Sequence, residues 1–259
     1  MKPLRELDAS AINAVLLDID DTLTTGGKLT AEAYSALERL HRAGKRVVTV
    51  TGRPAGWCDH IARMWPVDAV VGENGAFYFY FGDGRLHRRY HDEPAVRAAN
   101  RARLQAIAQS VLAAVPGCAL ASDQAYRETD LAIDYCEDVP ALPLDAAERI
   151  AAHMREAGLT AKVSSIHVNG WFGAYDKLEM TRRLFTERFG QDLSQVNRQV
   201  VFAGDSPNDA PMFAYFDHSV GVANVRRFSG RLAAAPKYLS HGESGAGFAE
   251  LAAHLLELA

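Results

Sequence analysis

Asp18-Ile19-Asp20-Asp21-Thr22 directly follows the apolar run Ala14-Val15-Leu16-Leu17. A short apolar run that ends in carboxylates predicts a buried strand with charge at its C-terminal end. Asp18 and Asp20 lie two residues apart, so on an extended backbone their side chains point the same way. Two like charges held together are unfavourable unless a cation or a proton lies between them. The stretch therefore indicates a metal site, an acid/base pair or both, although a solvated loop with helix-capping aspartates fits it equally well.

Two more apolar runs end in polar groups. Val200–Ala203 leads into Gly204-Asp205-Ser206-Pro207-Asn208-Asp209, and Val47–Val50 leads into Thr51-Gly52-Arg53. A hydroxyl, a glycine backbone and a guanidinium suit an anionic ligand. Because ligands bind beyond the C-terminal ends of parallel strands, these ends and the Asp18 stretch are expected to meet at one place.

Strand-like and helix-like runs alternate through both ends of the chain, which predicts a parallel α/β sheet. The expected strands cover residues 12–17, 46–50, 69–71, 199–203 and 219–222. The expected helices cover residues 31–43, a stretch after Pro54, and 178–189, the last capped by Asp176 and stopped by Gly190. Lys177 stands at the start of that last helix, and places a cation near the predicted acidic edge.

The middle of the chain follows a different pattern. Gly82-Asp83-Gly84 predicts a tight hairpin turn, and a long helix is expected over 93–114. Strands at 118–121 and 131–135, a helix at 144–157, and strands at 161–164 and 167–172 complete an α+β insert. It is either a separate domain or a part of the site, and its position between Asn74-Gly75 and Lys177 favours the site.

The ordered motifs resemble those of the haloacid dehalogenase superfamily of aspartate-nucleophile phosphatases. The matching residues are Asp18, Asp20 and Thr22 in the first motif, Thr51 in the second, Lys177 in the third, and Gly204, Asp205 and Asp209 in the fourth. The insert resembles the cap of subclass IIB, which includes sucrose-phosphatase, trehalose-phosphatase and Cof-like proteins. The resemblance implies a Rossmann-like, doubly wound parallel sheet as catalytic core (1–82 and 173–259) with an α+β cap domain (83–172) that sets substrate specificity.

The resemblance also implies the chemistry. Asp18 attacks the phosphorus of a phosphomonoester, and Asp20 protonates the leaving oxygen and then activates water. Mg²⁺ is expected on Asp18, Asp205 and the backbone carbonyl of Asp20, since hard oxygen ligands suit this ion. Asp209 is either a direct ligand or acts through water or Lys177.

Several residues are expected to bind substrate. Thr51, the backbone NH of Gly52 and Lys177 are expected to hold the phosphoryl oxygens. Other candidates have structural alternatives: Arg53 as a second anion clamp or a solvated arginine, Asn74 and Asn208 as substrate contacts or turn and capping residues. In 164–177, alternation places His167, Asn169 and Trp171 on one strand face, which is expected to cover the leaving group or is an exposed sheet face.

Composition narrows the function classes. The chain has 259 residues, 48% of them hydrophobic, and a net charge of −4, which gives no basic excess for nucleic acid. No apolar run is long enough to span a membrane, and three scattered cysteines fit a cytoplasmic protein. We expect a monomer or homodimer that hydrolyses a small phosphorylated metabolite, with sugar phosphates favoured. The alternatives are a phosphomutase of the same cap type and a non-catalytic ligand-binding protein.

Overall fold

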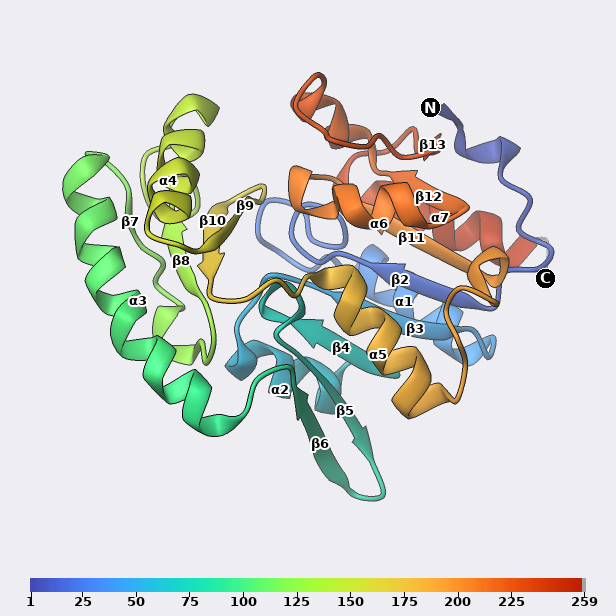
Figure 1. Cartoon of the computed structure of the whole chain (residues 1–259). Helices are drawn as coiled ribbons and strands as arrows, with labels where there is room; N and C mark the ends of the chain where they lie inside the picture. Colours follow the sequence, from blue (N-terminus) through green and yellow to red (C-terminus); the bar gives the residue numbers. More distant parts are fainter. Residues whose placement is uncertain (258–259) are drawn as a thin grey trace.

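The computed structural model describes residues 1–257, within which the strands form two sheets (Figure 1). The larger sheet has nine strands in the order β1-β13-β12-β11-β2-β3-β4-β5-β6. Their bounds are Lys2–Pro3, Tyr238–Leu239, His218–Gly221, Val200–Gly204, Ala14–Leu17, Arg46–Val50, Ala69–Gly72, Phe77–Gly82 and Arg85–Tyr90. Neighbouring strands are parallel from β1 to β4, whereas β5 and β6 are antiparallel to their neighbours. The predicted α/β class with a mainly parallel sheet is confirmed.

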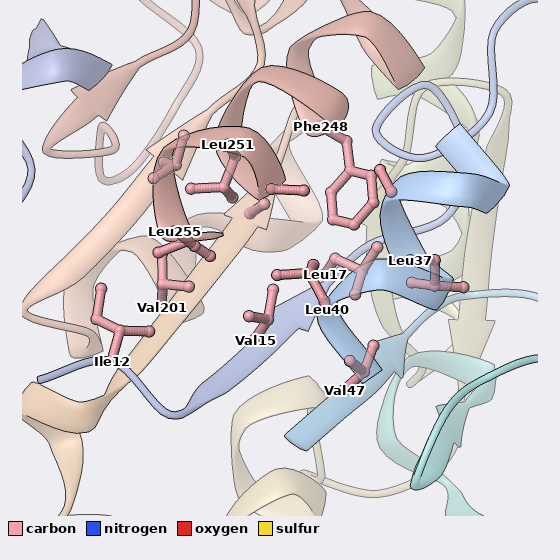
Figure 2. Packing of buried hydrophobic residues seen from close by; sticks show 14 of the residues in the cluster. Ile12, Val15, Leu17, Leu37, Leu40, Val47, Val201, Phe248, Leu251 and Leu255 are labelled. Carbon is pink, nitrogen blue, oxygen red and sulfur yellow. The ribbon is translucent and has the colours of Figure 1, made fainter. Parts of the chain in front are cut away.

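Helices cover both faces of the large sheet because its strands are apolar on both sides. Val15 and Leu17 of β2 pack towards α1 (Ala31–Arg42) and α7 (Ser244–Glu257), as Figure 2 shows. The alternate residues, Ala14 and Leu16, pack in the cluster that contains α5 (Lys177–Phe189) and α6 (Ala210–Tyr215). A further helix, α2 (Ala55–Met64), packs with β4 and β5. The sequence patterns used above did not predict α6, α7 or the short edge strands β1 and β13.

The smaller sheet has the strand order β7-β8-β10-β9 and is antiparallel. Its strands are Ala119–Leu120, Leu131–Asp134, His167–Trp171 and Thr160–Val163, and its helices are α3 (Pro94–Ala114) and α4 (Leu144–Glu156). Ile133 and Val168 pack in one apolar cluster with α3 and α4. The intervening residues on these strands therefore point to the opposite face, and the sheet lies beside the large one (Figure 1).

The predicted domain boundary at residues 82 and 83 separates the two strands of the hairpin β5–β6, whereas in the structure both strands belong to the large sheet. Residues 85–90, which the sequence analysis placed in the insert, form β6 and are hydrogen-bonded to β5 at the edge of the large sheet. The small sheet and its helices therefore begin with α3 at Pro94. The hairpin stays with the large sheet because six residue pairs align in register across the turn at Asp83 and Gly84.

Short 3-10 helices occupy several connections, at Leu4–Glu6, Glu73–Gly75, Gln124–Tyr126, Asn197–Gln199, Pro207–Asp209 and Ala223–Phe228. Within residues 1–257, no helix combines the length and the apolar character that crossing a membrane requires.

Candidate active site

The site forms where three adjacent strands end. β2 lies between β3 and β11, so Asp18, Thr51 and Asp205 follow neighbouring parallel strands at the same sheet edge. The backbone NH of Asp18 donates to the carbonyl of Ala203, which fixes the first carboxylate against β11. All three side chains are buried. The meeting of these strand ends that the sequence predicted is confirmed.

Lys177 lies inside the acidic cluster. Its Nζ is 3.2 Å from Oδ1 of Asp18 and 2.8 Å from Oδ1 of Asp209, and the side chain is 2% exposed. Burial by itself lowers the pKa of Lys177, but the carboxylates of Asp18 and Asp209 outweigh burial and raise it. Gly75, with φ +108°, lets the backbone that leads into Lys177 pass close by, since a Cβ at position 75 would lie 2.0 Å from the carbonyl oxygen of Asp176. The lysine therefore remains charged and holds the two aspartates together.

Asp209 accepts hydrogen bonds from protein donors on both of its carboxylate oxygens. Its Oδ1 accepts from Lys177, and its Oδ2 accepts from the backbone NH of Asp205 at 3.0 Å. Gly204 leaves the necessary room, because a Cβ at that position would lie 2.4 Å from Oδ2 of Asp209. This arrangement fixes the loop that follows β11.

The carboxylates fit a divalent cation. Ligand oxygens of Asp18, Asp205 and Asp209 lie within 4.8 Å of one another and all three residues are buried. Burial raises the pKa of Asp18 and of Asp205, and neighbouring carboxylates add to the rise, so the charged cluster is short of positive charge. Oxygen donors with excess negative charge are the ligand set that Mg²⁺ prefers.

Asp205 has two supporting contacts. Thr22 Oγ1 donates to its Oδ1 at 3.3 Å, and Asn224 Nδ2 donates to its Oδ2 at 3.1 Å. Asn224 also donates to the carbonyl of Asp21 and accepts from the NH of Ser244. No local sequence pattern marks Asn224, because only the fold brings the loop after β12 next to Asp205.

Asn74 presents a free donor beside the Thr51-Gly52 turn. Its Oδ1 accepts from Asn208 Nδ2 at 3.3 Å, whereas its Nδ2 is buried without a partner. A Cβ on Gly52 would lie 3.1 Å from that nitrogen, so the amide packs directly on the turn. A buried unpaired donor is unfavourable in the absence of a ligand, which indicates a place for an acceptor. The hydroxyl of Thr51 accepts from the NH of Arg53 and stabilises the same turn.

Arg53 contacts carboxylates on both sides of the site. Its Nε lies 2.9 Å from Oδ1 of Asp20, its Nη1 3.3 Å from Oδ2 of Asp123, and its Nη2 2.5 Å from Oε1 of Glu137. The side chain is 4% exposed. Burial lowers the pKa of Arg53, but Asp20 and Glu137 outweigh it and raise the pKa. Arg53 therefore joins the turn after β3 to the small sheet, with every guanidinium nitrogen beside a carboxylate.

His167 and Asn169 lie on the face of β10 opposite to Val168, as alternation predicts. His167 Nε2 is 2.8 Å from Oε2 of Glu137, and Asn169 Nδ2 donates to Oδ2 of Asp130 at 2.9 Å. Both side chains are buried. Trp171, expected on the same face, packs with Tyr175 and α2 in an apolar cluster. His167 and Asn169 therefore contact carboxylates of the small sheet and its loops.

Glu73 and Arg127 connect the small sheet to the site from the other side. The buried carboxylate of Glu73 accepts from the backbone NH groups of Glu128 and Thr129, at 2.9 and 2.7 Å, and from the Thr129 hydroxyl. Arg127 Nη1 donates to the carbonyl of Gly52 at 2.8 Å. Sequence reasoning missed both contacts, since they join residues more than 50 positions apart.

Replacing Glu73 by Gln is expected to lower the free energy of unfolding by about 2–4 kcal/mol. An amide NH₂ would face backbone NH groups that then lose their acceptor in a buried place. Urea unfolding followed by circular dichroism measures this. Glu128→Gln, in the same loop but partly exposed and 3.8 Å from Arg97, is the matched control and should change stability by less than about 1 kcal/mol. Equal stability of the two variants would contradict a connecting role for Glu73.

A cleft opens beside these groups. It has a volume of about 330 Å³ and is lined by Asp20, Asp21, Arg53, Glu137, Ser165 and Arg227, with Gly26 and Gly27 at its edge. The large sheet contributes the loops after β2 and β3, and the small sheet contributes residues 136–137 and 165–166. Asp18 and Lys177 are buried and do not line this cleft, whereas Asp20 and Asp21, which follow Asp18 in the loop after β2, do line it.

The sequence and the fold are similar to those of known proteins. Residues 15–99 match the sequence profile of haloacid dehalogenase-like hydrolases. Over 240 residues, the chain is 30% identical to a phosphoglycolate phosphatase of Pyrobaculum neutrophilum. The aligned region covers 91% of this chain and 92% of that protein. The fold is similar to the sucrose-phosphatase of Synechocystis, with TM-score 0.62, 16% identity and coverage of 95% of this chain and 98% of that one. It is also similar to a sugar phosphatase of subclass IIB, with TM-score 0.64, 13% identity and coverage of 96% and 100%.

Proposed function

The chain belongs to the family of haloacid dehalogenase-like hydrolases, and on this basis we propose that it is a phosphatase whose Asp18 attacks the phosphorus of small phosphomonoesters. The observation that carries the proposal is the position of Asp18, 3.2 Å from the buried ammonium of Lys177 at the end of β2. A carboxylate held beside a fixed cation is oriented for attack, and the cation reduces its repulsion from an anionic phosphate.

Other residues would bind the phosphoryl oxygens and transfer protons. The Thr51-Gly52 turn and the unpaired Nδ2 of Asn74 offer donors to the phosphoryl oxygens. Asp20 lines the cleft through which the leaving group would extend, so it is placed to give that group a proton and to take one from water in the second step.

Asp18 and Asp205, with the backbone carbonyl of Asp20, would hold Mg²⁺, and Asp209 would act mainly through Lys177 because its oxygens already accept protein donors. When bound, the ion would neutralise charge between the attacking carboxylate and the phosphate.

Chelation of divalent metal is expected to abolish phosphate release, and added Mg²⁺ to restore it. Ca²⁺ should restore little, since it prefers more ligands at longer distances. Phosphate release from an aryl phosphate measures activity, and the melting temperature with and without Mg²⁺ reports binding separately. Full activity of metal-stripped protein in chelator would exclude the ion from the reaction.

There are two candidate substrates, and they differ in the leaving group that is attached to the phosphate. We favour a sugar phosphate, because the cleft of about 330 Å³ is large enough for a ring and its lining is rich in hydrogen-bond acceptors. Phosphoglycolate is the second candidate, since the 30% identical relative is named for it. A phosphate-release screen over sugar phosphates, phosphoglycolate and other phosphometabolites decides between them.

Two alternatives give different results in that screen. A phosphomutase of the same cap type would transfer phosphate within the substrate and release little of it. A non-catalytic binding protein would show no turnover, an outcome that the intact set of Asp18, Asp20, Lys177 and Asp205 argues against.

The free cysteines 58, 118 and 136 favour a reducing cytoplasm as the place of action. A monomeric or homodimeric state stays a prediction.

A further inference from the structure

Glu137 reaches the cleft from the small sheet. Its side chain is 24% exposed, and it lines the cleft together with Asp20 and Ser165. Because Asp20 stands where the leaving oxygen would be protonated, a group beside Asp20 on the outer side meets the leaving group and not the phosphoryl oxygens. Strand alternation predicts His167 in this place, but His167 is buried behind Glu137.

Glu137 remains ionised. Burial tends to raise its pKa, but His167 and Arg53 outweigh burial and lower the pKa of Glu137 to about 2. An ionised carboxylate only accepts hydrogen bonds. Arg53 and His167 lie against both oxygens of Glu137 and use about three of its roughly four acceptor sites, so the carboxylate has about one site left for a hydroxyl group in the cleft.

The cations in the cleft are already paired. Each nitrogen of Arg53 lies within 3.3 Å of a carboxylate oxygen of Asp20, Asp123 or Glu137. Arg227 stands at the mouth of the cleft, 3.3 Å from Glu243, and its side chain is 63% exposed, so solvent screens its charge. Among the described residues that line the cleft, the buried cation Arg53 is fully paired and the charge of Arg227 is screened, so a carboxylate on the leaving group would meet Asp20, Asp21 and Glu137 without a buried cation to pair with.

We propose that Glu137 is a specificity-determining residue, which accepts hydrogen bonds from hydroxyl groups of the leaving group and excludes leaving groups that carry a carboxylate. The inference rests on the proposed phosphatase function and predicts that the enzyme prefers neutral polyol phosphates to phosphoglycolate. Hydrogen bonds to a charged acceptor favour the first class, and repulsion between like charges disfavours the second.

The test compares kcat/KM for three kinds of substrate: the best sugar or polyol phosphate of a panel, phosphoglycolate, and p-nitrophenyl phosphate. For wild-type protein, the first should exceed the second by at least about tenfold. In Glu137→Gln, this ratio should fall by about tenfold or more, through a higher KM for the polyol phosphate and a lower KM for phosphoglycolate. The aryl phosphate reports any general effect on Asp20 through Arg53.

Asp123→Asn is the matched control. Asp123 is a further carboxylate on Arg53, at 3.3 Å from Nη1, and it also accepts from Arg127 Nε at 3.0 Å, but it does not line the cleft. Its replacement disturbs Arg53 as Glu137→Gln does, yet the ratio of polyol phosphate to phosphoglycolate should stay within about twofold of wild type. Glu137→Asp keeps the charge and withdraws it by one methylene, so activity on the polyol phosphate should fall while phosphoglycolate remains a poor substrate.

The outcomes separate the two proposals. Wild-type protein that cleaves p-nitrophenyl phosphate but prefers phosphoglycolate to every polyol phosphate would overturn the role of Glu137 alone, as would an unchanged ratio in folded Glu137→Gln. If Glu137→Gln fails to fold by circular dichroism, the wild-type preference and the Glu137→Asp pattern decide. Wild-type protein that hydrolyses no phosphomonoester at all would overturn the proposed function and this inference with it.

Discussion

Asp18→Asn is expected to fold normally and to lose at least about 10³-fold in turnover. The amide keeps the size of the side chain at the end of β2, but it cannot form an acyl phosphate. The loss should be similar for aryl, sugar and small carboxylated phosphoesters, because the nucleophile acts on the phosphoryl group that all of them share. Steady-state phosphate release and a melting curve measure activity and folding separately.

The same experiment identifies the covalent step. Rapid acid quenching of wild-type protein with substrate should trap an acid-stable, base-labile phosphoryl group on the peptide that contains Asp18, and the variant should trap none. Asp83→Asn, an exposed aspartate in the hairpin turn with φ 51°, controls for the chemical change and should keep wild-type turnover. Near-wild-type turnover in folded Asp18→Asn would rule out Asp18 as the nucleophile.

Lys177→Met should reduce both stability and turnover. The ammonium lies 3.2 Å from Asp18 and 2.8 Å from Asp209, and its removal leaves buried like charges without their counter-charge. Breaking such a buried pair from one side costs about 3–5 kcal/mol. Turnover should fall by about 10²-fold or more, since Asp18 loses its fixed orientation and the phosphate loses a cation.

The measurements for Lys177→Met are urea unfolding and turnover at a temperature where the variant is folded. Added Mg²⁺ should recover part of the stability, because a cation in the acidic cluster offsets the lost charge. Lys28→Met, on an exposed loop, is the matched control and should change neither quantity. A Lys177→Met protein with unchanged turnover would remove the lysine from the mechanism.

The strand ends were predictable from the sequence, whereas the contacts between the sheets were not. Asp18, Thr51 and Asp205 follow apolar runs, and parallel strands bring their C-terminal ends together whatever the rest of the chain does. Lys177 was predictable as a helix start, since Asp176 caps α5 by accepting from the NH of Glu179. These predictions depend on local patterns that hold within one element.

The partners of Arg53 could not be predicted from such local patterns. The sequence suggested either an anion clamp or a solvated side chain, but the structure pairs Arg53 with Asp20, Asp123 and Glu137, which lie 33 to 84 residues away. Neither Glu137 nor Asp123 stands at a position that periodicity marks as functional. Their role follows from how the small sheet packs over the turn after β3, which a single sequence does not encode in any short motif.

The position of β2 in the large sheet has a consequence for synthesis of the chain. Its neighbour β3 follows soon after, but its other neighbour pairs Ala14 with Val200, so this edge stays open until the ribosome has made β11. At typical elongation rates the interval is on the order of 10–40 s. The strands of the small sheet all come from one contiguous segment and close earlier. A nascent chain therefore has a complete small sheet while one edge of the apolar strand β2 is still unpaired. That edge is where a chaperone would have most to protect.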